Sequence, residues 1–162
     1  MNITTYNGLV RDFSDHLMRY AYKVCRNNAN AEDAVQEAFI RLWANKKKVE
    51  VKGAKSWLFT TVYRILIDQH RKTKRMEMWE EMPDFAVHER FDSSDYSDDI
   101  KRALDALSPT QKSIVLLRDI EGYSYDDISQ IMEIKLSQVK TYLFRARKKL
   151  KSNIETIQSE KK

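Results

Sequence analysis

Glycine and proline are scarce in this sequence, which has three glycines and two prolines among 162 residues. Strict alternation of apolar and polar residues, the pattern of half-buried β-strands, is nearly absent as well. Because glycine and proline mark turns and helix ends, their scarcity beside long apolar periodicities of three and four residues predicts an all-α protein.

The sequence also lacks the features of secreted, membrane-spanning and metal-binding proteins. Its single cysteine, Cys25, cannot form an internal disulfide, and no Cys/His pair has the spacing of zinc ligands. The first residues form no basic head followed by an apolar run, and no stretch approaches the roughly 20 apolar residues that span a bilayer. We therefore expect a soluble cytoplasmic protein that binds no metal and no cofactor.

Charge is distributed unevenly along the chain. Residues 1–75 carry 15 Lys/Arg against seven Asp/Glu, residues 76–99 carry one arginine against nine acids, and the remaining residues carry 13 Lys/Arg against eight acids. The acidic strip has too little apolar surface to offset its ordering entropy, which predicts a linker at 76–99 between helical domains at 1–75 and 100–158. The strip is interpreted either as a spacer or as a segment that covers the basic faces of the free protein and suppresses stray DNA binding.

Three helices are predicted in the first domain. Apolar periodicity places them at about 7–27, at 31–46, and from 56 to a basic tail. Asn30 is expected to cap the second helix and Ser56 the third. In the second domain, Ser108 followed by proline and Gln111 predicts a capping box at the start of a further helix.

Aromatic and basic residues interleave along the third predicted helix, a combination suited to unstacked bases and their backbone. The aromatic residues are Trp57, Phe59 and Tyr63. Trp57 lies on the apolar stripe and is expected in the core, whereas Tyr63 and Arg64 lie off the stripe and are the better candidates. Arg71 and Lys72, in the basic tail, would contact phosphates or simply water.

One face of the second predicted helix lies off its apolar stripe and is polar. Its residues are Asp33, Gln36, Glu37, Ile40 and Arg41. Two carboxylates four residues apart can bind a metal, but no histidine or third acid lies near them to complete a site. A partner-binding or solvated face is the favoured interpretation.

Residues 124–150 have the pattern of a helix-turn-helix. Ser124 opens a short helix, a turn of about three residues follows, and a longer basic helix begins near Leu136. The longer helix has an apolar stripe, which is formed by Val139, Leu143, Ala146 and Leu150. Its opposite face presents groups suited to base edges, thymine methyls and phosphates, namely Gln138, Lys140, Thr141, Phe144, Arg145 and Lys148. We expect Lys140 and Arg145 to project together toward a duplex; a solvated amphipathic helix is the alternative.

The chain resembles bacterial sigma factors of the extracytoplasmic-function (ECF) group in two separate motifs. The run Asp33 to Trp43 and the segments Lys55 to Phe59 and Ile67-Asp68 are similar to sigma region two. Leu107-Ser108-Pro109, Glu121 to Ile128 and Val139 to Leu150 are similar to region four, although Glu133 stands in the turn where the family usually has glycine. Both motifs occur in the family's order.

This resemblance implies a transcription initiation factor that gives core RNA polymerase its promoter specificity. It implies that the polar face of the second helix binds the clamp helices of the largest polymerase subunit, and that the second subunit's flap is a further contact. It implies contact with the minus-thirty-five element by the face of the last helix. The loop implied to hold a flipped-out minus-ten base is Lys52, Gly53, Ala54, Lys55 and Ser56. An anti-sigma factor, often anchored in a membrane in this group, is the implied regulator.

Two other classes of function were weighed. A free-standing helix-turn-helix regulator would explain residues 100–155 but would leave the first 75 residues without a role. An enzyme is disfavoured because the three histidines are scattered and no phosphate-binding glycine loop or nucleophile motif occurs. No small-molecule substrate is expected.

Overall fold

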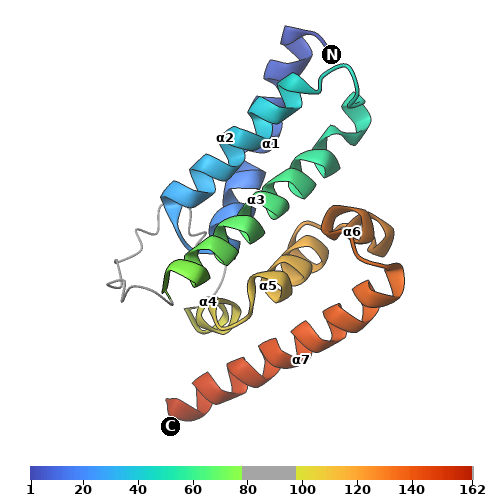
Figure 1. The fold of residues 1–162 in the computed structure, drawn as a ribbon. Helices are drawn as coiled ribbons and strands as arrows, with labels where there is room; N and C mark the ends of the chain where they lie inside the picture. Colours follow the sequence, from blue (N-terminus) through green and yellow to red (C-terminus); the bar gives the residue numbers. More distant parts are fainter. Residues whose placement is uncertain (78–97, 162) are drawn as a thin grey trace. The chain divides into compact units, whose positions relative to one another are not determined.

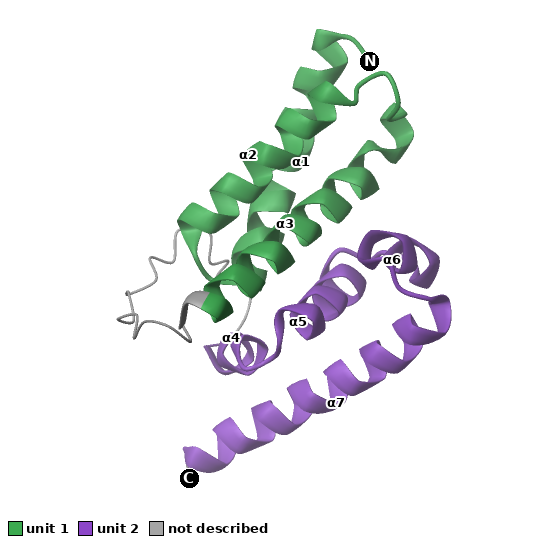
Figure 2. Ribbon diagram, in the orientation of Figure 1, with its two compact units in different colours: residues 1–91 green, residues 92–162 purple. Residues whose placement is uncertain are grey.

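The computed structural model describes residues 1–77 and 98–161, and these residues contain helices and no β-strand (Figure 1). The all-α expectation is therefore confirmed. The chain divides into two compact units, residues 1–91 and 92–162 (Figure 2). Both interpretations of the acidic strip concern residues that lie largely outside the described part of the chain.

Three long helices form unit 1, and each packs against the other two. They are α1 (Ile3–Cys25), α2 (Asn28–Ala44) and α3 (Ala54–Glu77), with a short 3-10 turn, η1 (Val51–Gly53), before α3. Large side chains from all three helices are fully buried, and the rings of Tyr20 and Phe59 lie 5.2 Å apart between centroids. Burial of this aromatic and aliphatic surface is the main source of stability for the unit.

The helix boundaries in unit 1 differ from the predicted ones by a few residues. Asn27, not Asn30, caps α2: its side chain accepts a hydrogen bond from the Asn30 backbone N–H at 2.9 Å. Asn27 is in extended conformation directly after Arg26, whose left-handed backbone ends α1, so the cap falls where the chain leaves one helix and enters the next. Ser56 lies inside α3, because η1 leads directly into that helix at Ala54.

Unit 2 is built around the last helix. Its elements are α4 (Asp98–Asp105), α5 (Pro109–Val115), η2 (Leu116–Ile120), α6 (Tyr125–Met132) and α7 (Leu136–Glu160). Helix α7 packs against α4, α5 and α6, and the buried residues of unit 2 include Ile114, Leu117 and Ile128. The predicted capping box at Ser108 is present, since Ser108 and Gln111 each accept a hydrogen bond from the other's backbone N–H.

The C-terminal half of α7 is fastened to α4. Asn153 Nδ2 donates to the Ala103 carbonyl at 3.0 Å, and Lys161 Nζ lies 2.7 Å from Asp99 Oδ1. Arg102 and Glu160 form a second, longer ion pair at 3.6 Å. These contacts position the C-terminal half of α7 against α4.

Candidate nucleic-acid interface

Helices α6 and α7 and the turn between them form the predicted helix-turn-helix. Ser124 caps α6 by accepting the Asp127 backbone N–H at 3.1 Å. Glu133 ends α6 in left-handed conformation, with φ 57°, which is the conformation that glycine adopts without cost. The Ser129 hydroxyl donates to the Ile134 carbonyl and closes the turn. The sequence signals at Ser124 and at the turn therefore correspond to the observed geometry.

A π-helical turn, η2, precedes α6 and was not predicted. The backbone N–H of Glu121 donates to the Leu116 carbonyl, five residues back, at 2.9 Å. Gly122 then adopts φ 75°, a conformation that favours glycine. Arg118 on this turn holds the start of α6: its Nη1 donates to the Tyr123 carbonyl at 2.9 Å, and its guanidinium lies 4.7 Å from the centre of the Tyr125 ring.

The buried and exposed faces of α7 follow the predicted stripe. Val139, Leu143 and Ala146 are buried and Leu150 is half-buried. On the outer face, Phe144 is 69% exposed, which is unusual for a large apolar side chain. The other predicted residues that are exposed are Lys140, Thr141, Arg145 and Lys148. This surface is cationic and includes an exposed aromatic ring.

Gln138 is partly used within the protein. Its side-chain oxygen accepts the Lys135 backbone N–H at 2.8 Å, so it caps the start of α7. The side chain is only half-exposed. Gln138 therefore has a structural role that was not predicted, and its oxygen is not presented to a base.

The expectation that Lys140 and Arg145 project together is wrong. Five residues along an α-helix correspond to a rotation of about 140°, so the two cations lie on opposite flanks of the outer face. Lys140 borders a groove between α6 and α7, whereas Arg145 borders a separate hollow beside α5 with Gln111 and Tyr142. A helix inserted in a major groove presents both flanks to the groove walls, so this arrangement suits contacts on either side of the helix.

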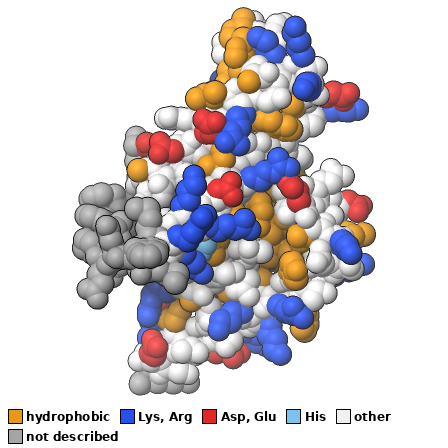
Figure 3. Space-filling model, viewed as in Figure 1, with side chains coloured by type: hydrophobic (Ala, Val, Ile, Leu, Met, Phe, Trp, Pro, Cys, Tyr) orange, Lys and Arg blue, Asp and Glu red, His pale blue; other side chains and the backbone are white. Residues whose placement is uncertain are grey.

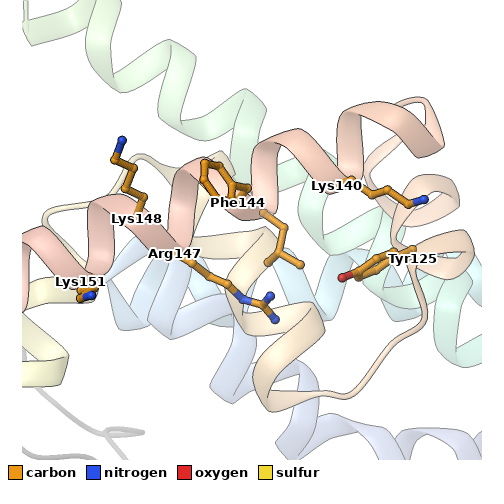
Figure 4. Close-up of a pocket in the computed structure, with 7 residues that line it drawn as sticks. Tyr125, Lys140, Phe144, Arg147, Lys148 and Lys151 are labelled. Atoms are coloured by element: carbon orange, nitrogen blue, oxygen red, sulfur yellow. The ribbon is translucent and has the colours of Figure 1, made fainter.

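The groove on the Lys140 flank has a volume of about 540 Å³ and is lined by basic residues (Figure 4). Three of its lining residues were missed as site residues in the sequence: Tyr125, Arg147 and Lys151. Helical spacing could have identified two of them, because positions 147 and 151 follow Lys140 by seven and eleven residues and so share its face. Tyr125 comes from α6, and nothing in the sequence indicates its approach to α7.

Arg147 is held by an acid from η2. Its Nε lies 3.2 Å from Asp119 Oδ2 and its Nη2 lies 2.5 Å from Asp119 Oδ1, a bidentate geometry. The hydrogen bonds that Arg147 donates to Asp119 raise the pKa of the Arg147 guanidinium. Both side chains are partly exposed, and such ion pairs contribute only about 0–1 kcal/mol to stability.

A second basic surface lies on unit 1, along α3 (Figure 3). Arg64, Arg71 and Lys72 are exposed and Tyr63 is half-exposed. Phe59 is fully buried against Tyr20, so it is not available to stack on a base. Trp57, expected in the core, is half-buried.

The loop before α3 presents only some of its predicted residues. Lys52 and Gly53 are exposed, and Lys55 and Ser56 are half-exposed. Ala54 is fully buried, so its side chain cannot touch a base, and this part of the prediction is wrong. Its burial follows from its place as the first residue of α3, where the helix meets the core of unit 1.

The polar face of α2 is accessible as expected. Asp33, Gln36 and Arg41 are exposed, and Ile40 is 61% exposed. Glu37 is half-exposed and pairs with Arg41 at 2.9 Å, one helical turn away. An exposed isoleucine bordered by charges of both signs is the composition of a protein-binding surface.

Two other kinds of site are absent from residues 1–77 and 98–161. Within these ranges no group of three or more His, Cys, Asp or Glu side chains is placed to hold a metal ion. None of the helices described there is sufficiently long and apolar to cross a bilayer.

Comparison with known proteins identifies both units. Residues 9–76 match the family described as Sigma-70 region 2, and residues 97–150 match Sigma-70, region 4. RNA polymerase sigma factor SigV of Bacillus subtilis is 32% identical, over 90% of either chain. ECF RNA polymerase sigma factor SigE of Mycolicibacterium smegmatis is 30% identical over 96% of this chain, which spans 64% of that relative's length.

Solved structures agree with these matches. The sigma factor RpoE of Bartonella quintana, in complex with the anti-sigma factor NepR, superposes with a TM-score of 0.78 at 26% identity. The alignment covers 94% of this chain and 98% of that one. CnrH, in complex with the cytosolic domain of CnrY, shares the fold with a TM-score of 0.69 at 19% identity, over 96% of this chain and 90% of that one.

Proposed function

Since the chain belongs to the sigma-70 family, in its extracytoplasmic-function group, we propose that it binds core RNA polymerase, directs it to specific promoters and assists DNA opening. The observation that carries this proposal is the outer face of α7, which combines exposed cations on both flanks with the exposed phenyl ring of Phe144. Such a face suits phosphates, base edges and thymine methyls in a major groove. The protein would supply recognition, and the polymerase would make the bonds.

The two units would divide promoter recognition between them. Unit 2 would bind the minus-thirty-five element through Lys140, Thr141, Phe144, Arg145 and Lys148. Unit 1 would bind the minus-ten element through the loop before α3 and through Tyr63, Arg64, Arg71 and Lys72 along that helix. Support comes from the exposure of these cations and from the suitability of Tyr63 for stacking on an unpaired base.

The face of α2 would bind the clamp helices of the polymerase's largest subunit. Ile40 would be its apolar centre, with Asp33, Gln36 and the Glu37–Arg41 pair around it. The flap of the second subunit would be a further contact. We also propose an anti-sigma factor as regulator, because the similar sigma factor RpoE was solved in complex with the anti-sigma factor NepR.

Run-off transcription with core polymerase on a promoter library tests this function. Transcripts that depend on the chain, and that start downstream of a shared two-part sequence, are the expected result. A free-standing helix-turn-helix regulator is the competing function. It would bind its DNA equally well without polymerase, whereas the proposed factor should bind promoter DNA tightly only in the presence of core polymerase.

Replacing Arg145 with alanine should cost about 1–3 kcal/mol of promoter binding if this side chain contacts a base edge. The loss should depend on the base pair that faces Arg145, and it is measured by titrating the holoenzyme on wild-type and substituted promoters. Lys148→Ala is the matched control, because a phosphate contact should weaken binding to all these sequences alike. Equal losses on every sequence for Arg145→Ala would contradict a base contact.

Reversing the charge of Glu37 to lysine should weaken polymerase binding by about 2 kcal/mol or more. The new lysine would lie beside Arg41 on α2, and it would repel any polymerase group whose charge complements Glu37. The affinity for core polymerase is measured by fluorescence with a labelled chain. Asp15→Lys, on an exposed position of α1, makes the same change in net charge away from this face. A similar loss in both variants would exclude a local contact at Glu37.

A further inference from the structure

The basic groove beside α7 contains one cation that is already neutralised. Lys140, Arg147, Lys148 and Lys151 line this groove with Phe144 and Tyr125. Within the described residues, only Arg147 among these four cations has a carboxylate partner, and that partner is Asp119. Figure 4 shows its guanidinium directed toward Tyr125, whereas the ammonium groups of Lys140 and Lys148 point elsewhere.

Arg147 occupies a position suited to a DNA phosphate. It follows Lys140 by seven residues and precedes Lys151 by four, so the three cations form a row on one flank of α7, at intervals of about 10 Å and 6 Å along the helix axis. About half of the Arg147 side chain is exposed. Its flexible stem could carry the charge outward if the guanidinium were released from Asp119.

We propose that Asp119 holds Arg147 away from DNA and so limits the part of the affinity that is independent of sequence. This inference rests on the proposed role of α7 in binding promoter DNA. The Asp119 carboxylate occupies the bidentate geometry that a phosphate would otherwise use. A phosphate that used the same two nitrogens of Arg147 would therefore have to displace Asp119.

The physical effect of this pair is a lower affinity for DNA of any sequence. Contacts with phosphates strengthen binding to all DNA sequences, and a genome offers far more nonspecific sites than promoters. One cation fewer in the row weakens binding to all of those competitors while leaving Phe144 and Arg145 available for bases. Asp119 lies on η2 and Arg147 on α7. Asp119 can therefore hold the Arg147 guanidinium without occupying the surface of α7 that faces the bases.

The test uses the full-length chain and a labelled 30-base-pair duplex of random sequence, with affinity measured by fluorescence anisotropy over a range of salt concentrations. Asp119→Asn keeps the size of the side chain and removes its charge. We expect roughly 5- to 10-fold tighter binding near 0.1 M salt, and a plot of log affinity against log salt that is steeper by about 0.9, the value for one added phosphate contact. Glu155→Gln is the matched control, because it makes the same charge change on an exposed position of α7 outside the groove.

Two further variants separate this role from a purely structural one. Arg147→Gln alone should leave the salt dependence unchanged, because Arg147 is not a phosphate contact in the native protein. Combined with Asp119→Asn, it should abolish the gain. A fall in the slope for Arg147→Gln alone, or a gain of equal size in Glu155→Gln, would overturn the proposal.

A structural role predicts a different result, in which Asp119→Asn and Arg147→Gln both lower the melting temperature and both weaken DNA binding; that result would also overturn the inference. Run-off transcription by the wild-type holoenzyme is measured in parallel. Normal transcription with no effect of Asp119→Asn refutes only the role of Asp119, whereas absent transcription refutes the proposed function itself.

Discussion

Replacing Phe59 with alanine is expected to lower the free energy of unfolding of unit 1 by about 3–5 kcal/mol, the usual cost of removing a buried phenyl ring. Phe59 is fully buried and packs on Tyr20, so the substitution leaves a cavity where α1 and α3 meet. Urea denaturation followed by tryptophan fluorescence measures this change. Trp43 lies on α2 and Trp57 on α3, so their fluorescence reports on unit 1.

Tyr63→Ala is the control for Phe59→Ala. Tyr63 is a half-exposed aromatic residue one helical turn further along α3, so its removal should leave the urea midpoint nearly unchanged. If it stacks on a promoter base, as proposed, it should reduce open-complex formation instead. A Phe59→Ala protein that unfolds at the wild-type urea concentration but fails to open DNA would restore the interpretation of Phe59 as a base-stacking residue.

Leu143→Ala is expected to cost about 2–5 kcal/mol of stability in unit 2. Leu143 is 1% exposed and lies on the stripe of α7 that faces the core. A domain of fewer than about 70 residues rarely has more than 3–5 kcal/mol to lose, so a large fraction of unit 2 should be unfolded at 37 °C. Amide NMR signals from residues 98–161 should collapse toward random-coil positions, and transcription that depends on the minus-thirty-five element should fall.

The neighbouring residue provides the control for Leu143→Ala. Phe144 is 69% exposed, so Phe144→Ala should keep the native amide signals and should lower only promoter affinity. The two substitutions thus separate the fold from the interface at adjacent positions. Native spectra for Leu143→Ala would show that α7 does not depend on its predicted inner stripe.

Local signals predicted the helices well, and the reason is visible at Ser108 and Ser124. Each cap is formed between residues three positions apart, so the sequence contains both partners. The inner stripe of α7 was predictable for the same reason, since helical periodicity alone decides which positions share a face. The cap of α2 was placed at Asn30 instead of Asn27 because three asparagines, at positions 27, 28 and 30, stand within one helical turn.

Features that depend on contacts between distant residues were not predictable. Asp119 and Arg147 are 28 positions apart, and their pairing requires the π turn, which has no clear sequence signal. Phe59 was misjudged because α3 packs against both α1 and α2, so its buried arc is wider than a single stripe. The separation of Lys140 from Arg145 could have been predicted from helical geometry alone. The error was to assume that all residues on the outer face of α7 point in the same direction.

The fastening of α4 to the end of α7 brings the beginning and the end of unit 2 together, as the 2.7 Å contact between Lys161 and Asp99 shows. Domains with adjoining ends tolerate transplantation and circular permutation, because their attachment points can be joined or moved with short connectors. Residues 98–161 should therefore fold after transfer as one unit into another chain. Bulky fusions appended after Lys161 would strain this junction, whereas fusions before Ile3 would leave it untouched.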